Sequence, residues 1–399
     1  MRIFILTLIY SQLLHAAILS DWRGPNRDGH YDAENLLDEW PANGAKEVWS
    51  FSGLGKGHTS AAVTKDRVFV TGILDETGYL FAFDISGDLL WKKAYGPEWT
   101  RNYAGTRSTP IVVDDLLYFL SGQGEVLCLS AKDGNHMWSI NLHEKFKAPV
   151  LDWGISEQLL VDGDNVYCTP GGAFSIVALN RFNGKVIWQA ENNGETASYC
   201  SPILTRHGGK NMLITMLEKS VIGVDADNGE LLWRHPHIAP YDIHANIPIY
   251  HHGFVYFQAG EGGTGQLLEI APDGQSVSVV WESNSLDTLT GATLLVDGFI
   301  YGSGYSRNGF QCLAWKTGEP KYVTDELKRA SVIYADGKII AYSERGKLAL
   351  IKATPEKFAL MSSVDIERGS GPHWAHPVVN DGRLYIRHED VLIVYDIAK

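Results

Sequence analysis

The chain has few cysteines, and their arrangement excludes several classes of protein. Only four occur in 399 residues: Cys128, Cys168, Cys200 and Cys312. None belongs to a C-x-x-C motif, and no two are adjacent. Zinc ribbons, thioredoxin-like redox proteins and c-type haem proteins need such spacings and are therefore excluded. A core of this size does not depend on disulfides, so we expect each cysteine to be buried as an apolar side chain.

The sequence also lacks long helical patterns and an excess of positive charge. No segment carries a sustained apolar stripe of helical period between capping residues, so we expect helices to be few and brief. The formal net charge is −13 at pH 7, which argues against nucleic acid and anionic membrane surfaces as partners. Because 45% of the residues are hydrophobic, the chain still has enough apolar material for a large core.

The one long apolar run lies at the N-terminus. After Arg2 the sequence reads IFILTLIYSQLL and then HAA, in which Ala16 and Ala17 are small enough for a cleavage site. A run of about a dozen residues is short for a membrane-spanning helix. We therefore predict a signal peptide at residues 1–16 and an exported chain, periplasmic or extracellular, without a transmembrane segment after cleavage. An uncleaved N-terminal anchor is the alternative.

A repeated pattern around tryptophan is abundant in this sequence. A turn with Asp or Asn leads to a glycine, and a tryptophan follows four residues later, as in ALNRFNGKVIWQ (Ala178–Gln189) and VDADNGELLWRH (Val224–His235). The tryptophans of this series are spaced by 42 to 50 residues: Trp49, Trp91, Trp138, Trp188, Trp233 and Trp281. Periods of this length indicate a propeller or a solenoid.

Each period contains four short runs that favour β-strands. From Arg107 to Leu142 the runs are RSTPIVV, LLYFLSG, GEVLCLSA and HMWSINL, separated by turn residues. A four-stranded antiparallel sheet cannot bury both faces alone, whereas sheets stacked radially around an axis bury one another. We therefore predict an all-β propeller of four-stranded antiparallel blades. The tryptophan of each outer strand should pack against the next blade, and the glycine should allow the turn before that strand.

The number of outer strands predicts eight blades, with seven as the alternative. The tryptophan series continues as Tyr322 and Met361, which completes eight outer strands. The N-terminal EVWSFSG supplies an outer strand without inner ones, and the C-terminal HPVVNDGRLYIRHEDVLIVYDI supplies three inner strands without an outer one. Pairing them would close the ring and cover both edges. We expect an N-terminal arm packing on the propeller at residues 17–45 and the propeller itself at 46–399.

The repeat resembles the tryptophan-docking repeat of the pyrroloquinoline-quinone (PQQ) propeller superfamily. ALNRFNGKVIW and GVDADNGELLW are the best copies, and DWRGPNRDG at Asp21–Gly29 is similar to the opening of secreted bacterial PQQ-like repeat proteins. The likeness covers essentially the whole mature chain. This superfamily includes quinone-dependent alcohol dehydrogenases and also non-catalytic scaffolds such as the outer-membrane assembly lipoprotein.

The sequence departs from both of these members. The resemblance to the dehydrogenases would imply adjacent cysteines over PQQ, with a calcium or lanthanide ion held by Glu, Asn and Asp, and neither set can be placed in this chain. The lipid-attachment cysteine of the assembly lipoprotein is also absent near Ala16. PQQ is therefore a possible cofactor without a supporting motif. We expect no metal site, and we favour a protein without catalytic activity.

The loops that precede the innermost strands supply the candidate binding site. In a propeller such loops surround the mouth of the central channel, where ligands commonly bind. The candidate residues are His58, Arg107, Trp153, Tyr199, His244, Thr290, Arg329, His373 and Trp374. Arginine donates paired hydrogen bonds to carboxylates, and flat aromatic rings stack on planar ligands or sugars. The alternative is that these side chains only bond neighbouring loops.

The histidines at 373 and 376 do not indicate a metal site, and the N-terminal arm carries no catalytic motif. His373 and His376 are three residues apart and would face opposite sides of a strand, so we expect no shared metal. The arm contains Trp22 and Trp40, which we expect to dock on one face of the ring, a ligand-reaching arm being the alternative.

The leading hypothesis is an exported propeller that binds a small-molecule ligand or a protein partner at its channel mouth without catalysis. A PQQ-dependent alcohol dehydrogenase-like oxidoreductase and an envelope protein-assembly scaffold are the alternatives.

Overall fold

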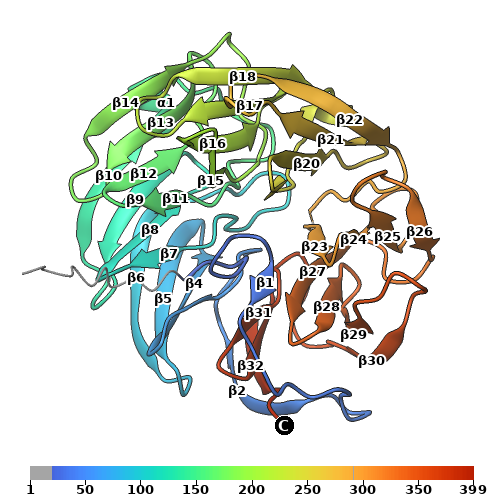
Figure 1. Ribbon diagram of the computed structural model, residues 1–399. Coiled ribbons are helices and arrows are strands. Elements are labelled where there is room, and N and C mark those ends of the chain that lie inside the picture. The colour runs from blue at the N-terminus through green and yellow to red at the C-terminus, as the bar shows by residue number, and fades with distance from the viewer. Residues whose placement is uncertain (1–19, 291) are drawn as a thin grey trace, which may run out of the picture.

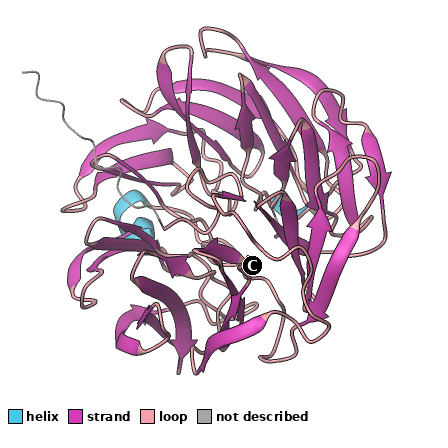
Figure 2. Cartoon of the chain, turned by 60° about the horizontal axis from the view of Figure 1, so that its bottom comes forward, coloured by secondary structure: helices cyan, strands magenta, loops and turns pink. Residues whose placement is uncertain are grey.

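Eight β-sheets stand around a central axis in the computed structural model, which describes residues 20–290 and 292–399 (Figure 1). Strands dominate the described chain (Figure 2), and the only helical segments in it are α1 (Leu142–Phe146) and the 3₁₀ turn η1 (Pro240–Asp242). The prediction of an all-β propeller with eight blades is confirmed. The predicted signal peptide at residues 1–16 lies outside the described residues.

Blades 1 to 4 follow one another along the chain, each running from the axis to the rim. Blade 1 contains β3 (Ala62–Val63), β4 (Arg67–Leu74), β5 (Thr77–Asp84) and β6 (Leu89–Pro97), and blade 2 contains β7 (Ile111–Val113), β8 (Leu116–Leu120), β9 (Glu125–Ser130) and β10 (His136–Asn141). Blade 3 contains β11 (Leu160–Asp162), β12 (Asn165–Cys168), β13 (Phe174–Asn180) and β14 (Val186–Glu191), and blade 4 contains β15 (Ile203–His207), β16 (Lys210–Met216), β17 (Ser220–Asp225) and β18 (Leu231–Pro236).

Blades 5 to 7 repeat this order, and blade 8 combines both ends of the propeller. Blade 5 contains β19 (Ile249–His251), β20 (Phe254–Gln258), β21 (Gly265–Ile270) and β22 (Val277–Ser283), and blade 6 contains β23 (Leu294–Val296), β24 (Phe299–Ser303), β25 (Phe310–Ala314) and β26 (Pro320–Val323). Blade 7 contains β27 (Ala330–Ala335), β28 (Lys338–Ser343), β29 (Lys347–Lys352) and β30 (Leu360–Asp365), and blade 8 contains β31 (Val378–Asn380), β32 (Arg383–His388), β33 (Val391–Asp396) and β2 (Lys46–Ser52).

The ring closes through blade 8, as the sequence predicted. Strand β2 pairs antiparallel with β33, from Lys46 opposite Asp396 to Ser52 opposite Val391. The strand that opens the propeller therefore becomes the outer strand of its last blade, next to the C-terminus in Figure 1. This arrangement covers the outer edge of β33, which would otherwise be unpaired.

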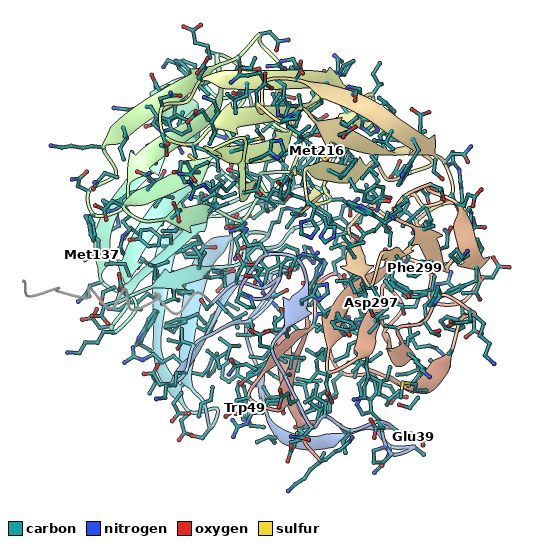
Figure 3. The ribbon with its side chains drawn as sticks, viewed as in Figure 1. Glu39, Trp49, Met137, Met216, Asp297 and Phe299 are labelled. Atoms are coloured by element: carbon teal, nitrogen blue, oxygen red, sulfur yellow. The ribbon has the colours of Figure 1, made fainter. Side chains whose placement is uncertain are left out.

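The indoles of the repeat join each blade to the following one. Five of the six donate a hydrogen bond from Nε1 to a backbone carbonyl of the next blade, at 2.8–3.2 Å. These pairs are Trp49 with Ile85, Trp91 with Lys132, Trp138 with Arg181, Trp188 with Ala226, and Trp281 with Trp315. The sixth, Trp233, is buried, but its Nε1 has no hydrogen-bond partner in the part of the chain that the structure describes. In Figure 3, Trp49 lies at the rim, whereas Met216 lies among the packed side chains of β16.

Five of the repeat glycines also contact an indole of the preceding blade: Gly87, Gly134, Gly184, Gly229 and Gly318. A Cβ atom added to Gly184 would lie 2.7 Å from the Trp138 ring, and one added to Gly229 would lie 2.6 Å from the Trp188 ring. The φ angles of these glycines are +67° and +80°. The repeat therefore requires glycine for two reasons, the left-handed backbone and the space for the indole.

The first part of the N-terminal arm lies inside the ring. Strand β1 (His30–Tyr31) pairs in parallel with β27, on the axial side of blade 7. Arg23 donates to the carbonyl of Thr293 in blade 6, at 3.0 Å, and Arg27 donates to that of Leu159 in blade 3, at 3.0 Å. The arm thus contacts inner strands on several sides of the axis and fills the channel instead of covering one face as we expected. Further along the arm, the backbone N–H of Trp40 donates to the Ser362 hydroxyl of blade 7, at 2.9 Å.

All four cysteines are free, and their burial confirms the expectation based on the size of the core. Among the described residues, no helix has the length and apolar character needed to cross a membrane.

Candidate functional site

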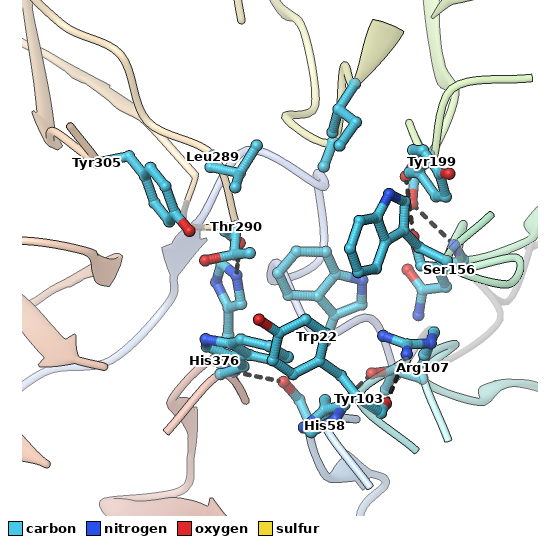
Figure 4. A pocket seen from close by; sticks show the side chains of 18 of the residues that line it. Trp22, His58, Tyr103, Arg107, Ser156, Tyr199, Leu289, Thr290, Tyr305 and His376 are labelled. Atoms are coloured by element: carbon cyan, nitrogen blue, oxygen red, sulfur yellow. Dashed lines mark hydrogen bonds between the residues drawn. The ribbon is translucent and has the colours of Figure 1, made fainter. Parts of the chain in front are cut away.

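A cavity of about 270 Å³ opens at the channel mouth, where the loops leading into the inner strands converge. Its floor is Trp22 of the N-terminal arm, which lies in the middle of the surrounding side chains in Figure 4. The lining residues are Trp22, His58, Ser60, Tyr103, Arg107, Thr109, Trp153, Ser156, Gln158, Tyr199, Ser201, Ile243, Ala245, Glu261, Leu289, Thr290, Tyr305, Trp374 and His376. Trp22 belongs to the arm that contacts inner strands around the axis, so the described part of the arm bounds the cavity on the channel side.

The structure brings six of the nine predicted site residues together in the wall of this cavity. They are His58, Arg107, Trp153, Tyr199, Thr290 and Trp374. The other three lie outside it. Arg329 is exposed above the Tyr305 ring, with its guanidinium carbon 3.9 Å from the ring centroid, and pairs with Glu344 at 3.2 Å. His373 is buried against His388, with ring centroids 3.4 Å apart.

His244 also lies outside the cavity, because its side chain turns into the protein. It is fully buried, and its Nε2 lies 2.9 Å from Nδ1 of His237 while its Nδ1 lies 3.3 Å from the Ser198 hydroxyl. Burial, together with the neighbouring His237, lowers the pKa of His244 to about 3, so the ring is neutral at physiological pH. This histidine holds the loop before β19 in place and does not face a ligand.

Three aromatic rings form a continuous wall on one side of the cavity. The ring centroid of Tyr103 lies 5.8 Å from that of Trp153 and 4.9 Å from that of Trp374. On the far side of Trp374, the imidazole of His58 follows at 4.8 Å. Trp153 is 37% exposed and Tyr103 is 58% exposed, so both rings have faces free to contact a ligand.

Arg107 supports this wall by bonding the loop that carries Tyr103. Its Nη2 donates to the carbonyl of Asn102 at 2.8 Å and to that of Tyr103 at 2.6 Å. Burial lowers the pKa of Arg107, although nearby Glu98 opposes the change. We expected the Arg107 guanidinium to bind a ligand carboxylate, but it donates hydrogen bonds to the backbone instead.

Buried carboxylates fix the loops that shape the cavity. Asp287 accepts hydrogen bonds from the backbone N–H groups of Gly262, Tyr305 and Ser306, at 2.8–2.9 Å. It thereby positions both Tyr305 and the neighbouring Glu261 of the cavity wall. Glu98 acts similarly on the opposite side, since it accepts from Trp99 N and Gly122 N. Bonds from several donors to one carboxylate make these loops rigid.

The floor of the cavity contains a histidine that the sequence analysis did not assign to the site. The ring centroids of His376 and Trp22 lie 4.3 Å apart in an edge-on arrangement. Its Nε2 lies 3.1 Å from the carbonyl of Thr290, so Nε2 carries the proton and Nδ1 is an acceptor. Burial, with a contribution from Arg23, lowers the pKa of His376 to about 3 and keeps the ring neutral.

The residues of the cavity do not fit PQQ bound with a metal ion. A tricarboxylate needs several cations, but among the described residues of the wall Arg107 alone is positively charged, and Glu261 is negative. Burial, with Arg107 and Arg387 nearby, lowers the pKa of His58 to about 3, so this ring adds no charge. Within the described ranges, no cluster of three His, Cys, Asp or Glu side chains could hold a metal.

The sequence is similar to curated proteins of two kinds. It is 30% identical over 138 residues to the outer membrane protein assembly factor BamB of Kangiella koreensis, covering 33% of this chain and 32% of that protein. It is also 30% identical over 162 residues to a quinoprotein ethanol dehydrogenase of Pseudomonas aeruginosa, covering 37% of this chain and 25% of that protein. The matches thus span a third or less of these relatives.

Solved structures of both kinds share the fold. BamB from Moraxella catarrhalis gives a TM-score of 0.65 at 15% identity, covering 88% of this chain and 99% of that chain. A quinohemoprotein alcohol dehydrogenase from Comamonas testosteroni gives a TM-score of 0.66 at 11% identity, covering 94% of this chain and 79% of that chain. The protein-family profile described as outer membrane protein assembly factor BamB matches residues 76–324, which is more than half of the chain. The protein therefore belongs to this family of PQQ-like repeat β-propellers.

Proposed function

We propose that this protein is an exported propeller that binds a ligand or a protein partner in the channel-mouth cavity, without catalysing a reaction. The observation that carries the proposal is the cavity itself, which opens at the channel mouth and has an aromatic wall and a tryptophan floor. Exposed aromatic faces in a concave site are typical of binding, because they bury large areas with little loss of side-chain freedom. Export rests on the predicted signal peptide at residues 1–16.

The polar contacts of the cavity support binding more than catalysis. Arg107 is held by two backbone carbonyls, His376 by the Thr290 carbonyl, and the Trp374 indole donates to Glu344 at 3.1 Å. General acid–base catalysis needs a group that can change its protonation near the working pH. The two cavity histidines instead have pKa values of about 3, which favours a fixed, neutral binding surface.

The test is a titration of the exported form with small ligands and peptides, comparing two variants. Trp374→Ala removes part of the aromatic wall, whereas Tyr241→Ala removes a ring that is 79% exposed and does not line the cavity. A compound that binds in the cavity should lose at least tenfold in affinity with Trp374→Ala and little with Tyr241→Ala. The proposal is wrong if every ligand that binds is insensitive to Trp374→Ala.

The family supports a second candidate, a scaffold in envelope protein assembly, since relatives named outer membrane protein assembly factor match this chain. In that case a pull-down from an envelope extract should recover one dominant protein with the exported chain. The oxidoreductase alternative makes a different prediction, namely reduction of a dye acceptor when PQQ, Ca²⁺ and an alcohol are supplied together.

A further inference from the structure

The cavity wall combines aromatic rings with uncharged hydrogen-bonding groups. Besides its tryptophans and tyrosines, it presents the hydroxyls of Ser60, Thr109, Ser156, Ser201 and Thr290. Among the described residues of the wall, Arg107 and Glu261 are the two charged ones, so their charges cancel. A ligand that carries a large net charge would find no matching charge here.

Hydroxyls at the base of the cavity keep their protons available for donation. The Ser60 hydroxyl accepts from His376 N, the Thr109 hydroxyl accepts from Ser60 N, and the Ser201 hydroxyl accepts from Gln158 N, at 2.8–3.0 Å. Because an accepting hydroxyl still has its own proton, each of these groups can donate to a ligand or to a water molecule. These bonds also link neighbouring blades around the channel, so the donors are held in fixed positions.

Polar atoms without partners lie beside these donors. Gln158 lines the cavity and is 1% exposed, yet neither its Nε2 nor its Oε1 has a hydrogen-bond partner among the described residues. The Nδ1 atom of His376, which is an acceptor, is also unpartnered. A buried amide without hydrogen bonds is destabilising, and a ligand hydroxyl or a bound water would satisfy it.

The floor of the cavity decides which part of a ligand can enter. Trp22 lines the cavity and belongs to the arm, which contacts inner strands on several sides of the axis. A ligand therefore enters from the channel mouth, as a free small molecule or as the end of a longer one. A volume of about 270 Å³ suits a single ring of ligand size. The end of a peptide carries an ammonium or a carboxylate charge, whereas the non-reducing end of a glycan carries hydroxyls.

We propose that the cavity binds a neutral saccharide, either a free sugar or the terminal residue of a glycan. This inference rests on the proposed binding function of the same cavity. The apolar C–H face of the sugar ring packs on the wall formed by Trp153, Tyr103 and Trp374. Its hydroxyls, which both donate and accept, match the mixed donors and acceptors at the base.

The experiment is isothermal titration of the exported protein with methyl glycosides of glucose, galactose, mannose and N-acetylglucosamine. Disaccharides of the same sugars distinguish a free sugar from a glycan end. Glucuronate, galacturonate, PQQ and short peptides with free ends are the comparison ligands. We expect at least one neutral sugar to bind more tightly than all of the comparison ligands.

Three variants locate the binding site. Trp374→Ala should weaken sugar binding at least tenfold, whereas Trp374→Phe, which keeps a stacking face, should retain most of the affinity. Gln158→Leu should weaken binding while the exposed-ring control Tyr241→Ala leaves it unchanged. Circular dichroism and the melting temperature of each variant confirm that it is folded.

The outcomes separate this inference from the function on which it rests. If a uronate, PQQ or a peptide binds best and Trp374→Ala abolishes that binding, the saccharide inference is overturned and the binding function stands. If no ligand shows binding that depends on Trp374, both are overturned. Failure of all neutral sugars to bind at millimolar concentration also overturns the inference.

Discussion

Glycine in the repeat serves the backbone and the neighbouring indole at the same position, and the two effects can be measured separately. Gly184 has φ +67° and lies under the Trp138 ring, whereas Gly163 has φ +53° with no atom within 4 Å of an added Cβ. Gly163→Ala should therefore cost about 1 kcal/mol, from the left-handed backbone alone. Gly184→Ala should cost about 3 kcal/mol, because the methyl group also displaces the indole.

Urea unfolding of both variants measures these costs. Equal losses of stability would mean that the contact between Gly184 and Trp138 does not stabilise the packing of blades 2 and 3.

The indole hydrogen bond can be isolated by comparing two buried tryptophans of the series. Trp138 is 7% exposed and donates to the Arg181 carbonyl at 2.8 Å, whereas Trp233 is 5% exposed and its Nε1 has no partner among the residues that the structure describes. Replacement by phenylalanine removes a similar area at each site but a hydrogen bond only at the first. Trp138→Phe should therefore destabilise the protein by about 1 kcal/mol more than Trp233→Phe does.

Differential scanning calorimetry of the two variants is the measurement. A larger loss from Trp233→Phe would contradict the role assigned to the bond.

The buried histidine pair should make stability depend on pH in a defined direction. The pKa of His244 is about 3 in the folded protein and about 6.5 when the chain is unfolded. Between these values the unfolded chain binds more protons, so the contribution of His244 is complete above pH 6.5 and is lost as the pH falls toward 3. His244→Gln removes this contribution and should make stability less sensitive to acid.

The free energy of unfolding of the variant and the unchanged protein, compared across this pH range, tests the sign. Burial raises the pKa of Glu157 to about 7, so the contribution of Glu157 to stability changes with pH in the opposite direction. Glu157 is present in both proteins, so its contribution cancels in the comparison. A steeper loss of stability in His244→Gln at low pH would contradict the assignment.

At the scale of the elements, the N-terminal arm protects amides of the inner strands. The Tyr334 N–H donates to the Gly29 carbonyl at 2.8 Å, and the Val112 N–H donates to the Ser20 hydroxyl at 3.0 Å. A chain that begins at residue 32 loses both partners and the floor of the cavity. Hydrogen exchange at Tyr334 and Val112 should become faster by at least tenfold, because these amides would face water.

The amide of Val255, a buried residue of β20 that bonds within blade 5, serves as the internal control. Exchange that increases equally at all three amides would indicate general loosening and would contradict a specific contact of the arm with blades 2 and 7.

The sequence predicted the blades well because each element repeats the same local chemistry. Tyr322 and Met361 occupy the outer-strand position in β26 and β30 although they are not tryptophans, which is why eight blades could be counted. The path of the arm could not be predicted in this way. Its bonds join residues far apart in the chain, such as Arg23 and Thr293, and no periodic pattern marks them.

The sequence predicted the cavity residues on the loops before the inner strands, but not those on other loops or on the arm. Trp153, Tyr199 and Trp374 precede inner strands, and the structure places them in the wall. Tyr305 was missed because it lies between β24 and β25, in a second set of loops on the same face that the sequence analysis did not consider. Trp22 was predicted to dock on the ring, but its place at the cavity floor depends on the path of the arm through the channel.

At the scale of the whole molecule, the ring is closed by hydrogen bonds between two ends of the chain and by no covalent bond that the structure describes. Lys46 on β2 lies opposite Asp396 on β33, so the pairing joins residues at the two ends of the propeller. Lys347 on β29 lies opposite Asp365 on β30. This second pair is again a lysine and an aspartate, but it joins two consecutive strands of one blade. The chain thus offers a matched comparison between closing the ring and closing one hairpin.

Replacing each of these Lys–Asp pairs by two cysteines should stabilise the protein to different extents. A disulfide lowers the entropy of the unfolded chain more when it closes a longer loop, and the difference expected here is about 2.6 kcal/mol in favour of the pair at 46 and 396. The four native cysteines are buried, so they should not compete for oxidation in the folded state. Chemical unfolding of both variants, oxidised and reduced, measures the gain in stability from each disulfide.

If the ring opens at β2 and β33 early in unfolding, the disulfide there should also slow unfolding, whereas the one within blade 7 should not. Equal gains in stability and equal unfolding rates would mean that the seam of blade 8 is not the weak point of the ring.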